Sequence, residues 1–485
     1  MKLRIRYILL LFFAPFVLNA QYSYQWTRFF GSDTLMEASS IGITASGDII
    51  IAGIIRNNGT HTLVQKISPQ GNIIWTRSLY HHKTAVPAKI VTLPDSTIVI
   101  AGYMRDWEEP GENIWLAKLD TAGTLLWERV YHQFGYGMAA DIKITPDNGF
   151  IIAANQFIPQ DNAFDWLVIK VNSFGLIQWY RTSGTRYNDN LNAVAVLPDN
   201  YYAVAGFVTQ DDGAQKVMAL SVYDSTGNEV AYNEFKHLGF SEAMDIIATH
   251  DTNLVVTGFR VDTFYKHDVV VIKLNHWADT LWEKTFHMPL RQVPFSMIQA
   301  FDHTYVIVYN VLTGEMPYAD IGILQLDPDG NIIFSRLLRR LSDDFIAQVI
   351  EQQDNSLALL ATNFVMGRGW VVSLTKWRSL LTSDLLFLFP KKKIIATKQR
   401  NITIRACVKS YMKPQKVDIF VNNKRVRTIT NFSLTQNRQC AFAFSTDLML
   451  RLGMNVIRFE TTDYKGYKFI RKRVIIYVPL PNKTW

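Results

Sequence analysis

Apolar and polar positions alternate along most of the chain with a period of two, and this pattern recurs about every fifty residues. Each recurrence centres on an aromatic residue that follows a turn and a short apolar run. These anchors are Trp26, Trp75, Trp127, Trp179, Tyr232, Trp282 and Phe334. A period of two is typical of half-buried β-strands, and a fixed repeat of this length is typical of stacked or ring-shaped β-sheet units.

Four strands are predicted in each repeat. The second ends in Ala-Gly, as at 48–53, and the third is apolar, as at 114–119. A turn such as Asp120-Thr-Ala-Gly then leads into the fourth strand, which carries the aromatic anchor. Asp or Asn opens an Asx-type turn and Gly supplies the positive φ that such a turn needs. We therefore expect an all-β chain of small four-stranded sheets.

The ends of the repeat array complement each other. The last repeat has three strands over 345–376 but no fourth, whereas residues 21–30 read as a fourth strand with no preceding three. Pairing the two would remove an exposed edge. The sequence thus predicts a closed seven-bladed β-propeller over 21–378 rather than an open array. Here the chain resembles the Trp-containing propeller repeats of exported bacterial proteins, and the resemblance implies an interaction role.

The first twenty residues have the pattern of a secretory signal peptide. Lys2, Arg4 and Arg6 precede an apolar run over 8–17, and a small residue stands at position 20. The run is about ten residues long, short of the roughly twenty that cross a bilayer as a helix. We expect residues 1–20 to be removed and the mature chain to have no transmembrane segment. The predicted location is the periplasm, the cell surface or the outside.

A second domain is predicted after a connector over 379–390. Residues 391–485 contain five alternating apolar stretches that suit one β-sandwich, and 450–466 resembles the last hairpin of immunoglobulin-like modules in exported bacterial proteins. Cys407 and Cys440 are the two cysteines of the chain. In an oxidising compartment they would form a disulfide, and the alternative is a pair of buried thiols.

Charge differs sharply between the two domains. Residues 21–389 hold 26 Lys and Arg against 38 Asp and Glu, whereas 390–485 hold 21 against 4. Such a basic module would attract anionic lipids, acidic glycans, an acidic protein face or its own propeller, unless it is simply a solvated face. Export argues against nucleic acid. The predicted anionic-partner patch comprises Lys391, Lys392, Lys393, Lys424, Arg425, Arg427, Arg471, Lys472 and Arg473.

Motifs for catalysis, cofactors or metals are not predicted. The turn at 327–331 resembles the start of a calcium loop, but the equivalent turns lack its carboxylates. His81-His82 has no further ligands at a metal-site spacing. The acidic pairs at 108–109, 211–212 and 343–344 are interpreted as solvated loop charges. The turn-to-Trp pattern resembles the Asp-box of sialidases, but that motif places Trp three residues after Gly, and here the spacing is four. The anchors are therefore interpreted as packing elements, with a binding platform as the alternative.

The sequence favours a non-enzymatic cell-envelope interaction or scaffold protein with a protein partner in the envelope. One concrete version is a periplasmic accessory of an outer-membrane translocon such as the type IX secretion machinery. Loops over 105–113, 157–165 and 262–267 are the candidate contact segments, because they are long and carry aromatic residues. The alternative is a secreted or surface propeller that binds or cleaves glycans.

Overall fold

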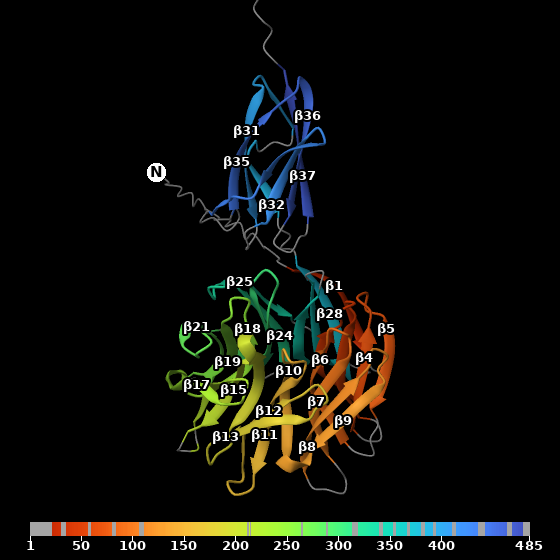
Figure 1. The fold of residues 1–485 in the computed structure, drawn as a ribbon, viewed down its shortest axis with the longest axis vertical. Helices are drawn as coiled ribbons and strands as arrows, with labels where there is room; N and C mark the ends of the chain where they lie inside the picture. The colour runs from red at the N-terminus through yellow and green to blue at the C-terminus, as the bar shows by residue number, and fades with distance from the viewer. Residues whose placement is uncertain are drawn as a thin grey trace, which may run out of the picture.

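The protein is described here by a computed structural model of the 485-residue chain. The structure describes residues 22–30, 35–56, 60–79, 84–105, 111–210, 213, 215–262, 265–287, 290–312, 319–338, 343–352, 356–365, 369–379, 384–390, 394–409, 414–434, 442–462 and 468–478. Nearly all of these residues lie in β-strands and tight turns, as the alternating sequence predicts. Figure 1 shows a ring of small sheets with a separate pair of sheets beyond one end.

Seven four-stranded antiparallel sheets make up the described part of residues 22–379. In strand order they are β2 (Leu35–Ile43), β3 (Ile49–Arg56), β4 (Thr60–Ile67) and β5 (Ile73–Leu79); β6 (Thr84–Thr92), β7 (Ile98–Arg105), β8 (Glu112–Leu119) and β9 (Leu125–Tyr131); β10 (Gly137–Ile144), β11 (Phe150–Ile158), β12 (Ala163–Val171) and β13 (Ile177–Ser183); and β14 (Asn190–Val196), β15 (Tyr202–Thr209), β16 (Lys216–Tyr223) and β17 (Glu229–Glu234).

The remaining three sheets are β18 (Ser241–Ala248), β19 (Leu254–Val261), β20 (His267–Leu274) and β21 (Thr280–Phe286); β22 (Arg291–Gln299), β23 (Tyr305–Leu312), β24 (Ala319–Leu326) and β25 (Ile332–Leu338); and β26 (Asp344–Glu351), β27 (Ser356–Val365) and β28 (Gly369–Ser379) with β1 (Tyr22–Phe30). Short 3-10 turns lie at η1 (His132–Phe134), η2 (Pro198–Asn200) and η3 (Lys236–Leu238). The first strand of each of the seven sheets contacts the first strand of the next, and β26 contacts β2. This arrangement is that of a β-propeller.

The chain's first described strand completes the last sheet. β1 pairs antiparallel with β28, from Tyr22 opposite Ser379 to Phe30 opposite Val372, and the two strands lie side by side in Figure 1. The pairing predicted for residues 21–30 is therefore observed. It gives β28 a hydrogen-bonded neighbour in place of an open edge.

The aromatic anchors join one sheet to the next. Trp75 of β5 donates its indole Nε1–H to the carbonyl of Thr121, in the turn of the following sheet, over 3.1 Å. Arg77 lies over the same ring, with its guanidinium carbon 5.7 Å from the centroid. The turn itself is the predicted Asx turn, because Asp120 Oδ1 accepts the Thr124 N–H at 2.7 Å. Gly123 takes φ of +81°, and a Cβ there would lie 3.0 Å from the Trp75 ring.

A buried lysine near the end of the third strand recurs in the ring. Lys170 is 2% exposed, and its ammonium donates to Asp147 at 2.8 Å and to Gln178 at 2.8 Å. Lys273 likewise donates to Asp251 at 2.7 Å. Each carboxylate stands in the turn between the first two strands of the same sheet. These ion pairs link that turn to the third strand, and they explain the recurring Lys that the apolar pattern alone does not.

The C-terminal part consists of two sheets that share one core. A four-stranded sheet is formed by β29 (Asp384–Phe389), β31 (Asn401–Lys409), β35 (Phe442–Met449) and β34 (Ser433–Leu434), and a five-stranded sheet by β30 (Ile394–Thr397), β37 (Lys468–Tyr477), β36 (Gly453–Thr462), β32 (Lys416–Val421) and β33 (Lys424–Ile429). Side chains from both sheets, such as Ile404 of β31 and Phe459 of β36, are fully buried in one cluster. The part is therefore a two-layer β-sandwich.

Part of the predicted connector belongs to this sandwich. Residues 384–389 form β29, which pairs antiparallel with β31. Phe387 lies in the core, with its ring centroid 5.0 Å from that of Phe459. Burial of this aromatic ring stabilises the strand against β31. Residues 384–389, which were predicted to be part of the connector, therefore form an edge strand of the sandwich.

Candidate functional site

Every first strand of the ring carries a β-bulge at the same place. In each pairing with the second strand, the register shifts by one residue near the middle of the first strand. The extra residues are Ser39, Ala88, Ala140, Asn192, Met244, Phe295 and Ala347. We call this set the bulge ring. A bulge re-aims side chains away from the regular pleat, and six of the seven line one cavity.

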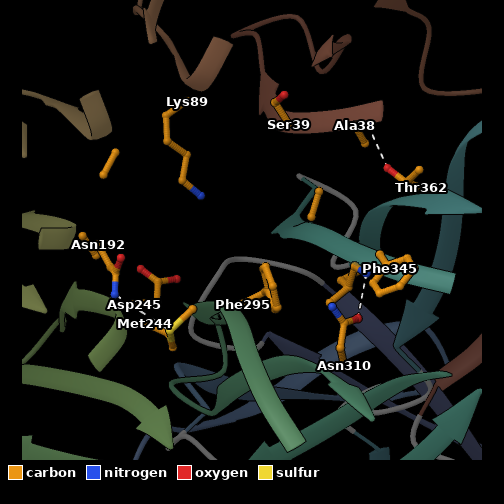
Figure 2. Close-up of a pocket in the computed structure, with 14 residues that line it drawn as sticks. Ala38, Ser39, Lys89, Asn192, Met244, Asp245, Phe295, Asn310, Phe345 and Thr362 are labelled. Atoms are coloured by element: carbon orange, nitrogen blue, oxygen red, sulfur yellow. Dashed lines mark hydrogen bonds between the residues drawn. The ribbon is translucent and has the colours of Figure 1, made fainter. Parts of the chain in front are cut away.

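This cavity, of about 430 Å³, is the mouth of the central channel. Figure 2 shows Lys89 extending into it from one wall, with Asn192, Met244 and Asp245 beside it. Phe295 and Phe345 form the facing part of the lining. Phe295 is 39% exposed. The volume is within the range usual for ligand sites, and the lining combines two phenylalanine rings with six polar or charged residues.

The aromatic wall continues onto the rim. The ring of Phe345 lies 5.9 Å from that of Trp370, which makes an edge-on contact with Phe364 at 5.4 Å. Phe364 is 40% exposed. Exposed aromatics grouped around a pocket are more typical of a binding face than of a solvated surface.

Directly after the bulge stands a position that connects neighbouring sheets. Ser40, Asp141, Asp245, Ser296 and Gln348 each accept a hydrogen bond from a backbone N–H in the next sheet around the ring, at 2.7–3.4 Å. The donors are Ile90, Val194, Met297, Val349 and Ile41. We call these five acceptors the clamp residues. Because first strands are sheet edges, these N–H groups would otherwise lack a partner and cost free energy.

Two sheets have no acceptor at the clamp position, where Lys89 and Ala193 stand. The N–H groups of Ile142 and Ile246 therefore receive no acceptor from the preceding sheet. They donate instead to the carboxylates of Asp141 and Asp245 at 2.8 and 2.9 Å. Each aspartate therefore binds two N–H groups with its two oxygens. The seven equivalent N–H groups all have a partner, and each oxygen of the Asp141 and Asp245 carboxylates accepts one of them.

Electrostatics at the mouth depend on Lys89 and Asp245. Burial raises the pKa of Asp245, while the positive charges of Lys89 and Lys143 and the hydrogen bond from Met297 oppose that rise. Lys143 is itself paired with Asp141 at 2.5 Å. A second cavity of about 470 Å³ follows along the channel and shares Lys89 with the first. Lys89 thus stands where both cavities meet.

The cavity faces away from the C-terminal sandwich. Trp370 at the start of β28 contacts the aromatic wall, whereas the sandwich follows the other end of β28 along the chain and lies beyond that end of the ring in Figure 1. The predicted contact segments over 105–113, 157–165 and 262–267 all connect second to third strands. In this antiparallel topology those connections lie at the cavity end, although the structure describes only part of the first and third.

The predicted basic patch does not form one cluster. Arg425 of β33 and Lys472 of β37 share the outer face of the five-stranded sheet, where Arg458 lies over the Phe420 ring at 4.2 Å. Arg427 instead donates to Thr446 of the other sheet at 3.2 Å, and Arg473 lies 3.6 Å from the Phe387 ring centroid. Lys424 and Arg471 are exposed at β33 and β37. Lys391, Lys392 and Lys393 lie outside the described residues.

The remaining candidates from the sequence are the two cysteines, the histidine pair and the acidic pairs. Cys407 is fully buried in β31, and Cys440 lies outside the described residues, so the disulfide stays a prediction. His81-His82 and the acidic pairs at 108–109 and 211–212 also lie outside them. The interpretation of residues 343–344 as solvated was wrong for Asp344. It is fully buried at the start of β26 and accepts a hydrogen bond from the Asn363 side-chain amide.

The residues of the channel mouth were missed from the sequence. Lys89, Asn192 and Phe295 lie in the first strands of their sheets, for which the sequence pattern gave no exact bounds. The available signal was the repeat itself. Alignment of the seven first strands puts the bulge ring in one column and the clamp residues in the next, and that comparison singles out Lys89 as the one cation in its column.

Comparisons with known proteins show no family for this chain. No family model matches the chain, and no curated protein matches it. Solved structures that resemble it include the β-propeller domain of the Trilobed protease from Pyrococcus furiosus (TM-score 0.45, 10% identity, 73% of this chain and 97% of that one). YCF48 from Cyanidioschyzon merolae gives a TM-score of 0.43 at 9% identity, over 72% and 98% of the two chains. The Hadza microbial sialidase Hz136 gives 0.42 at 13% identity, over 71% and 66%.

Within the described residues, no group of three or more His, Cys, Asp or Glu side chains is arranged to hold a metal ion. The same part of the chain contains no helix that is long and apolar enough to span a membrane.

Proposed function

We propose that the chain is an exported, non-enzymatic interaction protein of the cell envelope. In this proposal a closed seven-bladed β-propeller binds a protein partner at the channel mouth, and an immunoglobulin-like basic sandwich at the other end holds an acidic surface. A periplasmic accessory of an outer-membrane translocon, such as the type IX secretion machinery, fits this two-ended design.

One observation carries the binding role. At the channel mouth the carboxylates are bound to backbone N–H groups, while Phe295 and Phe364 remain exposed. Acid–base catalysis needs a carboxyl group that can reach a substrate proton. Asp245 is the one acidic residue in the described lining of the cavity, and both of its oxygens already accept hydrogen bonds. The exposed aromatic rings would gain most from burial against a partner.

Basic side chains on the sandwich support the proposed binding of an acidic surface. Its described outer face carries Lys472 and Arg458 on the adjacent strands β37 and β36, and Arg425 on β33, beyond β32. Glu460 pairs with Arg458 at 3.1 Å, and Asp418 pairs with Lys416 at 2.9 Å and lies 3.9 Å from Arg425. The net attraction therefore comes from the many basic residues of the whole domain. Such attraction weakens as salt screens it.

Affinity purification from solubilised envelopes at low and high salt tests the two ends separately. The variant Phe295→Asp should lose the protein partner at both salt concentrations, because it places a charge among the aromatic rings. Leu126→Asp is the matched control, since Leu126 is an exposed apolar residue on the outer strand β9. Reversal of Arg425 and Lys472 to Glu should abolish only salt-sensitive retention. Equal capture by wild type and Phe295→Asp would reject the channel mouth as the binding face.

Glycan binding or cleavage is the second candidate function. The observation that bears on it is the raised pKa of Asp165. Burial, together with the negative charges of Asp189 and Asp161, raises the pKa of Asp165 to about 6, a value suited to a general acid. However, Gly184 lies against this carboxyl group, since a Cβ on Gly184 would be 2.3 Å from Asp165 Oδ1. Asp165 therefore has little access to a substrate. A carbohydrate array, with hydrolysis assays on any ligand found, tests this candidate directly.

A further inference from the structure

Lys89 departs from the arrangement that holds the ring together. Five of the seven clamp positions carry an acceptor, and Ala193 merely lacks one. Lys89 places a cation there and leaves the Ile142 N–H to be bound by Asp141. Residues that break a local structural rule while a neighbour compensates tend to mark functional sites.

The Lys89 ammonium is available to a ligand. Among the described residues its side chain makes no hydrogen bond and no ion pair, although it is half-buried and projects into the cavity of Figure 2. Asp245 attracts it electrostatically, but the two Asp245 oxygens accept the N–H groups of Ile246 and Met297 at 2.9 and 2.7 Å. A cation with no direct partner in a partly desolvated site favours an anion from outside.

Apart from Ser39, the remaining polar side chains of the lining are already engaged. Asn310 Oδ1 accepts the Ile346 N–H at 2.9 Å, and Thr362 Oγ1 accepts the Ala38 N–H at 2.8 Å. Asn192 donates to the Ala243 carbonyl at 2.7 Å and accepts from Asn190 at 2.6 Å. A sugar would need several free partners for its hydroxyl groups. One anionic group attached to an apolar body satisfies this lining better.

We propose that the channel mouth binds the C-terminal carboxylate of a partner polypeptide whose last residues are apolar. The carboxylate pairs with Lys89, and the apolar side chains pack on Phe295 and Phe345. Most of the lining comes from the first strands that surround the axis of the ring, and a chain end presents its carboxylate at its tip, with chain on one side only. This inference rests on the proposed function, in which the same face binds a protein partner.

Fluorescence anisotropy of the mature chain with labelled peptide pools tests the inference. The pools share random apolar residues at their last three positions and differ only in carrying a free acid or an amide at the C-terminus. We expect the acid pool to bind about tenfold more tightly, equivalent to about 1.4 kcal/mol. Lys89→Ser should remove this preference, Lys89→Arg should keep it, and Phe295→Ala should weaken both pools.

Two controls separate loss of binding from loss of folding. Lys89→Ser should fold as well as wild type, because serine serves as a clamp residue at positions 40 and 296. Lys216→Ser removes another lysine at the same end of the ring, one paired with Glu242 at 3.2 Å, and should leave the preference unchanged. Equal binding of acid and amide pools would overturn the inference, as would a wild-type preference in Lys89→Ser.

A fatty acid offers the same chemistry from another source, so dodecanoate is included as a competitor. Lys89-dependent binding of dodecanoate without peptide binding would overturn the polypeptide assignment. If Lys89→Ser captures the envelope partner normally while Phe295→Asp does not, the carboxylate inference fails and the proposed function stands.

Discussion

We expect that replacing Asp141 destabilises the ring unless Lys89 is replaced as well. Asp141 is 1% exposed and binds two N–H groups, those of Ile142 and Val194, at 2.8 and 3.0 Å. In Asp141→Ser the hydroxyl group can still accept from Val194, as Ser40 does from Ile90 at 3.0 Å. The Ile142 N–H loses its acceptor, because Lys89 cannot supply one.

The expected cost follows from that single orphaned group. A buried N–H without a partner costs about 1–3 kcal/mol, and loss of the partly exposed ion pair to Lys143 adds up to about 1 kcal/mol. Adding Lys89→Ser supplies an acceptor to Ile142 from the neighbouring sheet. The double variant should therefore recover about 1–2 kcal/mol relative to Asp141→Ser, while Lys89→Ser alone should change stability by less than about 0.5 kcal/mol.

Urea unfolding followed by tryptophan fluorescence measures this coupling as a double-mutant cycle. Lys143→Ser is the control for the ion pair, and its effect should simply add to that of Lys89→Ser. The reasoning is refuted if Asp141→Ser is as stable as wild type, or if the double variant is no more stable than Asp141→Ser.

Four further outcomes are expected. Gly123→Ala should destabilise the chain by about 1–3 kcal/mol, since the methyl group meets the Trp75 ring at a positive φ; a melting temperature equal to wild type would count against the packing role of the anchors. Burial would raise the pKa of Asp251, but hydrogen bonds from Lys273, Thr249 and Asn253 outweigh it and lower the pKa to about 2. The stability that this pair contributes should be complete above about pH 4 and be lost as pH falls toward 2, a loss absent from Asp251→Asn in acid titrations of unfolding. For Asp165, whose folded pKa is raised to about 6, stability should instead fall as pH rises from about 4 to 6, and Asp165→Asn should melt higher than wild type at pH 7 but not at pH 4. Removal of residues 21–30 should abolish cooperative unfolding of the ring, and retention of the wild-type melting profile would argue against closure by β1.

Most of the ring was predictable because its determinants are local. The Asx turn at Asp120 and the positive φ at Gly123 follow from short-range chemistry that residue types reveal. The complementary ends of the array indicated the pairing of β1 with β28. The position of β29 was not predictable in the same way, because an apolar run such as 384–389 suits a docked connector and an edge strand equally well. Only the pairing with β31 distinguishes them.

The channel mouth could not be predicted from any single repeat. A bulge shifts the register of each first strand, so alternation alone assigns the wrong face to residues such as Asn192 and Phe295. The double use of Asp141 depends on what a different sheet supplies about fifty residues earlier. Such relations appear only when equivalent positions are compared across the ring.

Comparison across the ring also separates positions set by packing from positions free to vary. A glycine follows the turn wherever the preceding anchor is tryptophan, as with Trp75 and Gly123, because a Cβ would press on the ring. Where the preceding anchor is Tyr232, the turn carries Ala278 at a φ of +63°. Anchor and turn thus vary together, as expected of a packed contact. The bulge ring varies more widely, from alanine to phenylalanine, whereas each of the five clamp residues accepts a backbone N–H group. If these positions served packing alone, we would expect similar residues in all seven sheets. The cavity instead has Lys89 on one wall and Phe295 on the other, which is better explained by a ligand that is polar at one end.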